Sequence, residues 1–222
     1  MVHKIMNEKV FIFLEAFFIA VLVLIIGFII GYAIESARLN SALNDYRQFE
    51  VSMLDLKLQD YYFQTIDQGQ CSQAISANFN FSDKVYQTGL DIEKYEQNSQ
   101  ILTGMILTEK EQYVLLKTEI WLNSVLLKNR CGDPFHTIVY FYSQNPSETT
   151  RQEQAAISDT LKQLKDKYGN ALILLPIAGD LNLDIVSIQM ENYNITSLPT
   201  ILIDEHTKLE GYQSLSTLEK YI

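Results

Sequence analysis

The sequence has few of the residues that mark several common classes of protein. Only two cysteines occur in 222 residues, which excludes a small disulfide-rich scaffold. The three histidines, His3, His136 and His206, are too far apart in the chain for any zinc- or iron-binding spacing. With 4 prolines and 9 glycines, the chain is neither collagen-like nor a Pro/Gly-rich disordered protein. From these patterns we predict no metal, cofactor or catalytic residue.

Positive charge is also scarce. The chain has 17 Lys and Arg against 27 Asp and Glu, a net charge of −10. A protein that binds nucleic acid without regard to sequence neutralises phosphates with clustered Lys and Arg. The acidic balance argues against that class, and we expect no nucleic acid among the partners.

One long apolar run stands near the N-terminus, within residues 11–34. Residues 16–34 carry no charge, and as a helix these 19 residues would span about 28 Å, close to the thickness of a bilayer core. We therefore predict a transmembrane helix over 11–34, after a short N-terminal segment of residues 1–10. A cleaved signal peptide is the alternative, since Gly31-Tyr32-Ala33 is a small-x-small site, but the run is longer than a typical signal core.

The charges that flank this run suggest an orientation. Lys4 and Lys9 precede it, whereas Arg38 and Arg47 follow it among acidic residues. We therefore expect a protein of the cell membrane. By the positive-inside rule its N-terminus is cytoplasmic, and the chain after the transmembrane helix is extracytoplasmic. The chain is expected to cross the bilayer once.

Helical periodicity dominates residues 35–131, which contain no proline. We predict a helical stalk or middle region, with one helix start capped by Ser82 and another at a capping box beginning at Thr108. An apolar stripe follows the first helix out of the membrane, formed by Leu39, Ala42, Tyr46, Phe49, Met53 and Leu56. The stripe either packs on helices of the same chain or forms a homodimer through the 39–56 helix.

Cys71 and Cys131 fall at two predicted element boundaries. Outside the cytosol such thiols tend to pair, so a structural disulfide is the favoured interpretation. Two unpaired thiols and a redox-active pair are the alternatives, although the spacing is unlike Cys-x-x-Cys.

After residue 132 the helical periodicity gives way to short apolar runs separated by polar segments. Unbroken β-branched, aromatic or aliphatic runs predict buried strands near 136–142, 171–177 and 200–204, followed by a short strand near 208–212. Helical patterns lie between them and at the C-terminus, giving the order βαβαββα over 132–222. A helical crossover makes the first two strands parallel.

This order, together with the segment Tyr193-Asn194-Ile195-Thr196-Ser197-Leu198-Pro199-Thr200, resembles the thioredoxin fold. The resemblance covers about 90 residues and implies an α/β thioredoxin-like domain. It also implies that Pro199 is the family's cis-proline and that Ser197, Leu198, Pro199 and Thr200 line a groove for an extended peptide.

The chain departs from the family where the redox chemistry belongs. Thioredoxins carry Cys-x-x-Cys after the first strand, but here Ser147 and Thr150 align with the two cysteine positions. A hydroxyl cannot form a disulfide, so dithiol exchange is chemically excluded at this site.

Three functions follow as hypotheses. The leading one is a membrane-anchored thioredoxin-like domain that binds a peptide or protein partner without redox catalysis. The second is an atypical oxidoreductase that uses Cys71 and Cys131. The third is a membrane assembly subunit that dimerises through the 39–56 helix.

Two sequons, Asn80-Phe81-Ser82 and Asn194-Ile195-Thr196, are candidate glycan sites on an exported surface.

Overall fold

The computed structural model describes residues 2–98, 103–132 and 134–222, and it divides into two compact units, Met1–Asp55 and Leu56–Ile222. The first unit is part of one long helix, α1 (Val2–Phe63). Within α1, Phe17–Ile34 has a mean hydropathy of 2.9 and none of it is buried in the protein. By length and composition this one helix is apolar enough to cross a membrane.

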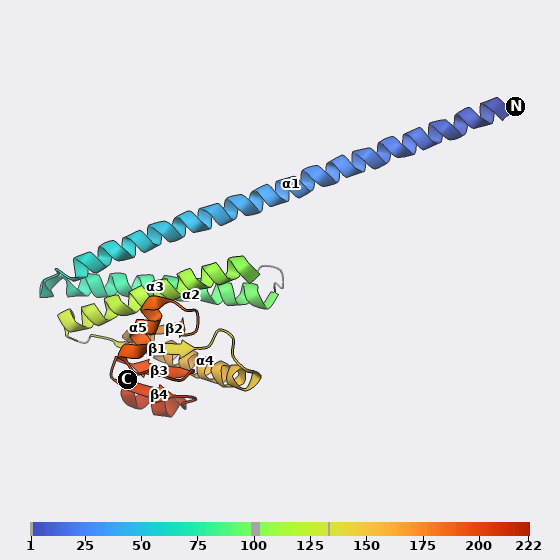
Figure 1. Cartoon of the computed structure of the whole chain (residues 1–222). Coiled ribbons are helices and arrows are strands. Elements are labelled where there is room, and N and C mark those ends of the chain that lie inside the picture. The colour runs from blue at the N-terminus through green and yellow to red at the C-terminus, as the bar shows by residue number, and fades with distance from the viewer. Residues whose placement is uncertain (1, 99–102, 133) are drawn as a thin grey trace. The chain divides into compact units, whose positions relative to one another are not determined.

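The second unit contains all the other elements (Figure 1). After the end of α1 come η1 (Gln68–Gln70), α2 (Cys71–Asn98) and α3 (Thr103–Cys131). The remainder comprises β1 (His136–Tyr142), α4 (Glu148–Tyr168), η2 (Gly169–Ala171), β2 (Leu172–Ala178), α5 (Asp184–Asn192), β3 (Thr200–Ile203), β4 (Thr207–Glu210), α6 (Leu215–Leu218) and η3 (Glu219–Tyr221).

The four strands of the described residues form one mixed sheet in the order β2-β1-β3-β4. β1 is parallel to β2, whereas β1–β3 and β3–β4 are antiparallel. The register pairs Phe141 with Thr200, so the start of β3 lies at the end of β1.

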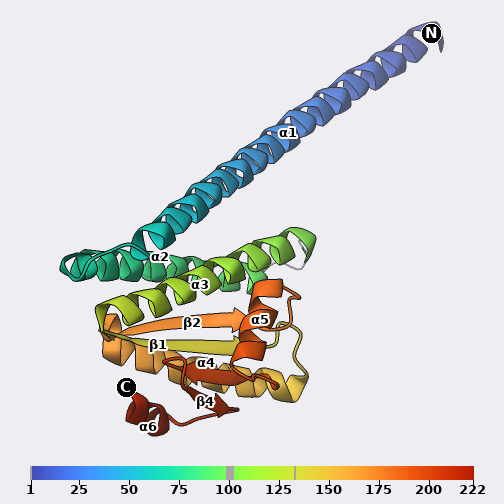
Figure 2. The same ribbon diagram turned by 60° about the vertical axis from the view of Figure 1, so that its left-hand side comes forward.

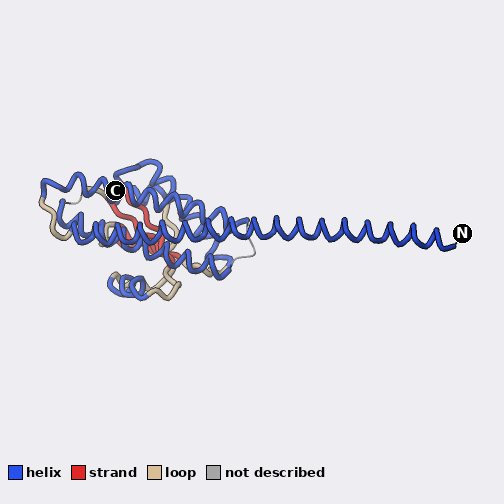
Figure 3. Tube along the Cα trace, turned by 90° about the horizontal axis from the view of Figure 1, so that it is seen from above, coloured by secondary structure: helices blue, strands red, loops and turns tan. Residues whose placement is uncertain are grey.

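Helices cover both faces of the sheet (Figure 2). Figure 3 shows the strands in red among the blue helices. On one face, α4 and α6 pack against alternate strand residues in a core that includes Ile138, Ile157 and Leu218. On the other face lies α3, whose Trp121 is 1% exposed and packs edge-on against Phe141 with ring centroids 5.8 Å apart. The predicted middle region therefore shares a core with the predicted C-terminal domain.

The helices of this middle region differ from the prediction at their starts. Ser82 does not cap a helix, because α2 runs unbroken from Cys71 and buries Ser82 to 4% exposure. The polar side chain of Asn78 is accommodated in the same helix, since its Nδ2 donates to Ser124 Oγ on α3 at 2.9 Å. The helix expected to begin at Thr108 begins at Thr103.

The stripe predicted for dimerisation falls largely outside the described side chains, which exclude those of Leu39, Ala42, Tyr46 and Phe49. Its last member, Leu56, is fully buried in the second unit and packs within the same chain. Homodimerisation through the 39–56 helix stays a prediction.

Side chains bond two carbonyls at the outer edge of β2. Lys165 Nζ donates to Leu172 O at 2.8 Å, and Lys117 Nζ donates to Pro176 O at 2.7 Å. Pro176 itself has no N–H to offer to another strand.

Candidate functional site

Ser147 and Thr150, which the resemblance predicts to align with the cysteines of thioredoxins, lie together at the start of α4. Ser147 is the N-cap of the helix, and its Oγ accepts a hydrogen bond from the Thr150 N–H at 3.2 Å. The two side-chain oxygens are 2.8 Å apart and hydrogen-bonded. Such a cap satisfies one of the free N–H groups at the helix start, which explains locally why these residues fold this way.

This arrangement has a clear chemical limit. Both groups are hydroxyls, and the Ser147 oxygen is occupied as an acceptor from the helix. Glu148 follows in the first turn, where a carboxylate interacts favourably with the helix dipole. The site can offer hydrogen bonds to a ligand, but it has no sulfur with which to exchange a disulfide.

The predicted groove residues Ser197, Leu198, Pro199 and Thr200 lie at the end of the sheet where β1 ends and the loop to Ser147 begins. The Leu198–Pro199 peptide bond is cis. Pro199 O accepts from the Gly211 N–H at 3.0 Å, and Thr200 Oγ1 donates to Ser197 O at 2.7 Å. Since Thr200 pairs with Phe141 in β1, the segment lies beside the loop that leads to Ser147.

Leu198 differs from its neighbours in this segment. Within the described part of the chain, neither its N–H nor its C=O forms a hydrogen bond with the protein. Its half-exposed side chain lies over Gly179, where an added Cβ would come within 3.1 Å of Leu198 Cδ2. An extended peptide binds through main-chain hydrogen bonds and apolar contacts. The N–H and C=O of Leu198 and its apolar side chain could supply both.

Asp180 fixes the loop between β1 and α4, a role that sequence reasoning missed. One carboxylate oxygen accepts from Ser143 Oγ at 2.6 Å, and the other accepts from the Gln144 N–H at 2.7 Å. Burial raises the pKa of Asp180, but these hydrogen bonds outweigh it and hold the pKa below its usual range. The signal in the sequence was an acidic residue two positions after a buried strand, next to Gly179.

Cys71 and Cys131 form a disulfide with a Cα–Cα distance of 5.7 Å, which agrees with the predicted structural pairing. The bond joins the start of α2 to the end of α3, shortly before β1 begins. Pro199 lies near the other end of β1, and a seven-residue strand spans about 20 Å. The structure therefore does not bring the two cysteines together with the groove residues.

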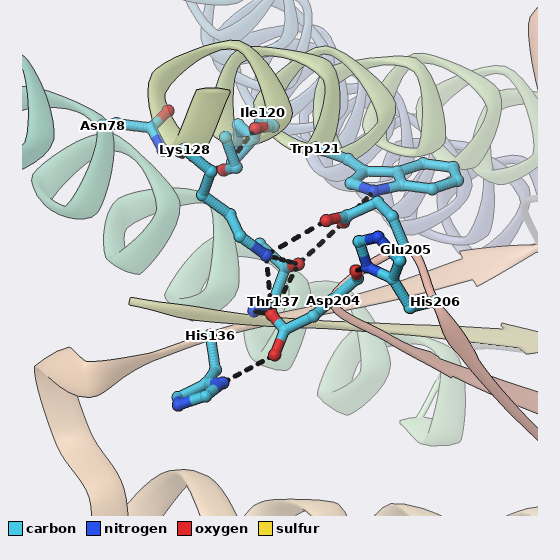
Figure 4. Close-up of polar contacts among 10 residues, drawn as sticks. Asn78, Ile120, Trp121, Lys128, His136, Thr137, Asp204, Glu205 and His206 are labelled. Carbon is cyan, nitrogen blue, oxygen red and sulfur yellow. Dashed lines mark hydrogen bonds and ion pairs between the residues drawn. The ribbon is translucent and has the colours of Figure 1, made fainter. Parts of the chain in front are cut away.

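A second polar cluster, unforeseen from the sequence, joins α3 to the turn between β3 and β4 (Figure 4). Lys128 is 6% exposed, and its Nζ lies 2.7 Å from Asp204 Oδ1 and 3.1 Å from Glu205 Oε2. Glu205 Oε1 also accepts from Trp121 Nε1 at 2.8 Å and from Thr137 Oγ1 at 2.7 Å. We call these five residues the Lys128 cluster.

The charges in the Lys128 cluster stabilise one another. Burial lowers the pKa of Lys128, but the hydrogen bonds and charges of Asp204 and Glu205 outweigh it and raise the pKa above its usual value. Burial raises the pKa of Asp204, but Lys128, His136 and the Thr137 N–H together lower it overall. The cluster holds α3 on the sheet through an ion pair that stays charged at neutral pH.

The turn that supplies the two acids is unusual. Asp204 and Glu205 have φ angles of 48° and 60°. Residues other than glycine rarely adopt this left-handed backbone conformation. The contacts of their carboxylates with Lys128 and Trp121 offset the backbone cost of this turn.

No family model matches the chain, and no curated protein matches it. Among solved structures, the germline-specific thioredoxin Deadhead from Drosophila melanogaster is similar at 18% identity and a TM-score of 0.30, covering 40% of this chain and 84% of that chain. A structure described as a malarial protein is similar at 22% identity and a TM-score of 0.29, covering 40% of this chain and 98% of that chain. At these scores neither likeness bears on fold or function.

Proposed function

We propose that the chain is a single-pass, membrane-anchored thioredoxin-like protein that binds extended peptide or protein segments without redox catalysis. Its anchor is the apolar helix within 11–34. Its N-terminus is cytoplasmic, and its C-terminal domain lies outside the cytosol. The binding site is the groove of Ser197, Leu198, Pro199 and Thr200, beside the degenerate positions Ser147 and Thr150.

The observation that carries this proposal is the N–H and C=O of Leu198, which form no hydrogen bond within the described part of the chain and lie just before β3, at the end of the sheet from which the loop to Ser147 leaves. An extended ligand would gain affinity there from main-chain hydrogen bonds to this N–H and C=O. Apolar contacts with Leu198 would add to them. The hydroxyls of Ser147 and Thr150 favour binding over exchange, because neither can attack a disulfide.

The oxidoreductase alternative has less support. Cys71 and Cys131 are already paired with each other, near the opposite end of β1 from the groove. A thiol substrate could reach that disulfide without touching Pro199, so the thioredoxin-like groove would play no part in the reaction.

Binding can be tested with a fluorescently labelled, reduced and carboxymethylated α-lactalbumin, an unfolded probe with no free thiol. The full chain in detergent is expected to raise the anisotropy of this probe. The variant Ser197→Arg places bulk on an exposed groove position and should weaken binding at least about fivefold, which corresponds to about 1 kcal/mol. Ser76→Arg, at an exposed position on α2, is the matched control and should bind like the wild type.

Equal binding by the two variants, or no binding by the wild type, would contradict the proposal. Turnover of an insulin disulfide by the wild type at the rate of an active thioredoxin would also contradict it. As a gain-of-function arm, the double variant Ser147→Cys with Thr150→Cys should acquire such turnover, since the two side-chain oxygens already lie 2.8 Å apart at a helix N-terminus.

A further inference from the structure

The two sequons of this chain lie in very different structural settings. N-linked glycosylation uses an Asn with a Ser or Thr two residues later, and both side chains must be reachable together. Asn80-Phe81-Ser82 lies inside α2, whereas Asn194-Ile195-Thr196 follows α5 and precedes the groove. The sequence alone does not separate them.

The helical sequon cannot present its two polar side chains on one surface. In an α-helix, residues i and i+2 point about 200° apart around the axis, so they do not face the same side. Asn80 is exposed, whereas Ser82, on the buried face of the same helix, is only 4% exposed. An enzyme that reaches Asn80 in the folded chain does not reach the hydroxyl of Ser82.

The second sequon has the opposite geometry. Asn194 has a φ of 52° and ends the turn after α5. Asn194 and Thr196 are both exposed, whereas Ile195 between them is 5% exposed, so the two polar side chains point outward and the apolar one points inward. Within the described part of the chain, neither the Asn194 amide nor the Thr196 hydroxyl has a hydrogen-bond partner in the protein.

The backbone of this turn is held in place while its polar side chains remain available. The Asn194 N–H donates to Glu191 O at 3.0 Å, the Ile195 N–H donates to Met190 O at 2.7 Å, and Asn194 O accepts from Lys208 Nζ at 2.7 Å. A substituent on Asn194 Nδ2 would therefore extend into solvent without breaking any of these bonds.

We propose that Asn194 is an N-glycosylation site and that Asn80 is not. The donor is a lipid-linked oligosaccharide pyrophosphate, and a membrane-bound oligosaccharyltransferase catalyses the transfer. Asn194 Nδ2 bonds to the anomeric carbon, the bond between that carbon and the pyrophosphate oxygen breaks, and the lipid pyrophosphate leaves with the electron pair. The amide proton passes to a base of the transferase.

This proposal rests on the extracytoplasmic C-terminal domain of the proposed function. Asn194 lies three residues before Ser197. A glycan at Asn194 would therefore be attached next to the groove residues.

The test is translation of the full chain into microsomes, which supply both transferase and donor. A C-terminal tail carrying one Asn-x-Thr sequon is added to report independently which side of the membrane the C-terminus reaches. The wild type should carry two glycans, both removed by endoglycosidase. Asn194→Gln and Thr196→Ala should each leave one glycan, Thr196→Ser should keep two, and Asn80→Gln should keep two.

Each other outcome overturns the proposal in a distinguishable way. If the tail alone is glycosylated, the topology stands and Asn194 is not an acceptor. If neither is glycosylated, the extracytoplasmic topology fails and the glycan site fails with it. If Asn80→Gln removes a glycan, the structural distinction between the two sequons is wrong.

Discussion

Replacing Lys128 by Met tests whether the Lys128 cluster fixes α3 on the sheet. The substitution keeps the volume and helix propensity of the side chain but removes the ammonium group, which lies 2.7 Å from Asp204 and 3.1 Å from Glu205. The two carboxylates, 25% and 11% exposed, are then left side by side without their cation. Removing one partner from a buried ion pair typically lowers the free energy of unfolding by about 3–5 kcal/mol. Because Asp204 is partly exposed, we expect a loss of about 3 kcal/mol, at the low end of that range.

The single tryptophan provides the assay, because Trp121 belongs to the Lys128 cluster and its fluorescence reports on the cluster itself. For a unit of this size, a loss of about 3 kcal/mol lowers Tm by roughly 6–12 °C. Lys162→Met, at an exposed position on α4, is the matched control and should change stability by less than about 0.5 kcal/mol. The full chain in detergent is used throughout.

The dependence on pH follows from the directions of the pKa shifts. The lowered pKa of Asp204 gives stability that is present above its usual value of 3.8 and is lost as pH falls through the folded pKa. The raised pKa of Lys128 gives stability that is present below 10.5 and is lost as pH rises through the folded pKa. The difference between wild type and Lys128→Met should therefore be flat between these limits and shrink outside them.

A double-mutant cycle with Glu205→Gln separates the ion pair from simple packing. Because Glu205→Gln removes one of the two unpaired charges, the double variant should be less destabilised than the sum of the single variants, by about 1 kcal/mol or more. Additive effects, or a loss no larger than that of Lys162→Met, would refute the electrostatic account of the cluster.

Three further perturbations address other parts of the molecule. Cys71→Ala opens the disulfide that closes a 60-residue separation and should cost about 4 kcal/mol, and adding a reductant to the wild type should produce a similar fall in Tm. Burial and the nearby Asp60 raise the pKa of Glu119 above 4.5, so its charged form destabilises the fold at pH 7. Glu119→Gln should therefore stabilise the chain by up to about 1 kcal/mol at pH 7. In denaturant titrations this gain should vanish below pH 4.5. Gly179→Ala places a methyl group about 3.1 Å from Leu198 and should cost about 1–3 kcal/mol in denaturant titrations, with weaker binding of the carboxymethylated probe.

The local patterns of the sequence were sufficient to predict strands and much of the helix content. The run His136–Tyr142 is β-branched and aromatic without alternation, and the structure covers β1 on both faces. Strand composition of this kind can be recognised in the sequence alone. The helix caps cannot be recognised in the same way here: neither Ser82 nor Thr108 begins a helix, and Ser147, which caps α4, was not predicted to be a cap.

The errors arose where tertiary contacts decide the outcome. Asn78 and Ser82 suggest a break in a helix when considered alone, because their side chains compete with the backbone for hydrogen bonds. In the fold Asn78 instead bonds Ser124 on α3, 46 residues away, and α2 continues. Sequence periodicity contains no information about such a partner.

The Lys128 cluster was missed for the same reason and for a second one. Lys128 and Asp204 are 76 residues apart, and a lysine near a helix end is normally interpreted as solvent-exposed. The turn at Asp204 and Glu205 also lacks the Gly or Asn that usually marks positive φ angles. The turn is stabilised by ion pairs with the distant Lys128, and a local sequence pattern does not reveal them.

The two bonded carbonyls at the outer edge of β2 affect how this sheet could grow. A strand approaching β2 meets two ammonium groups already bonded to Leu172 O and Pro176 O, and it would have to break those bonds to form a ladder. Extension into a neighbouring chain is therefore directed to β4, where four residues allow only a short ladder. Domain fusions or peptide tags designed to continue the sheet should be placed against β4, and fibril-like stacking through β2 should be disfavoured.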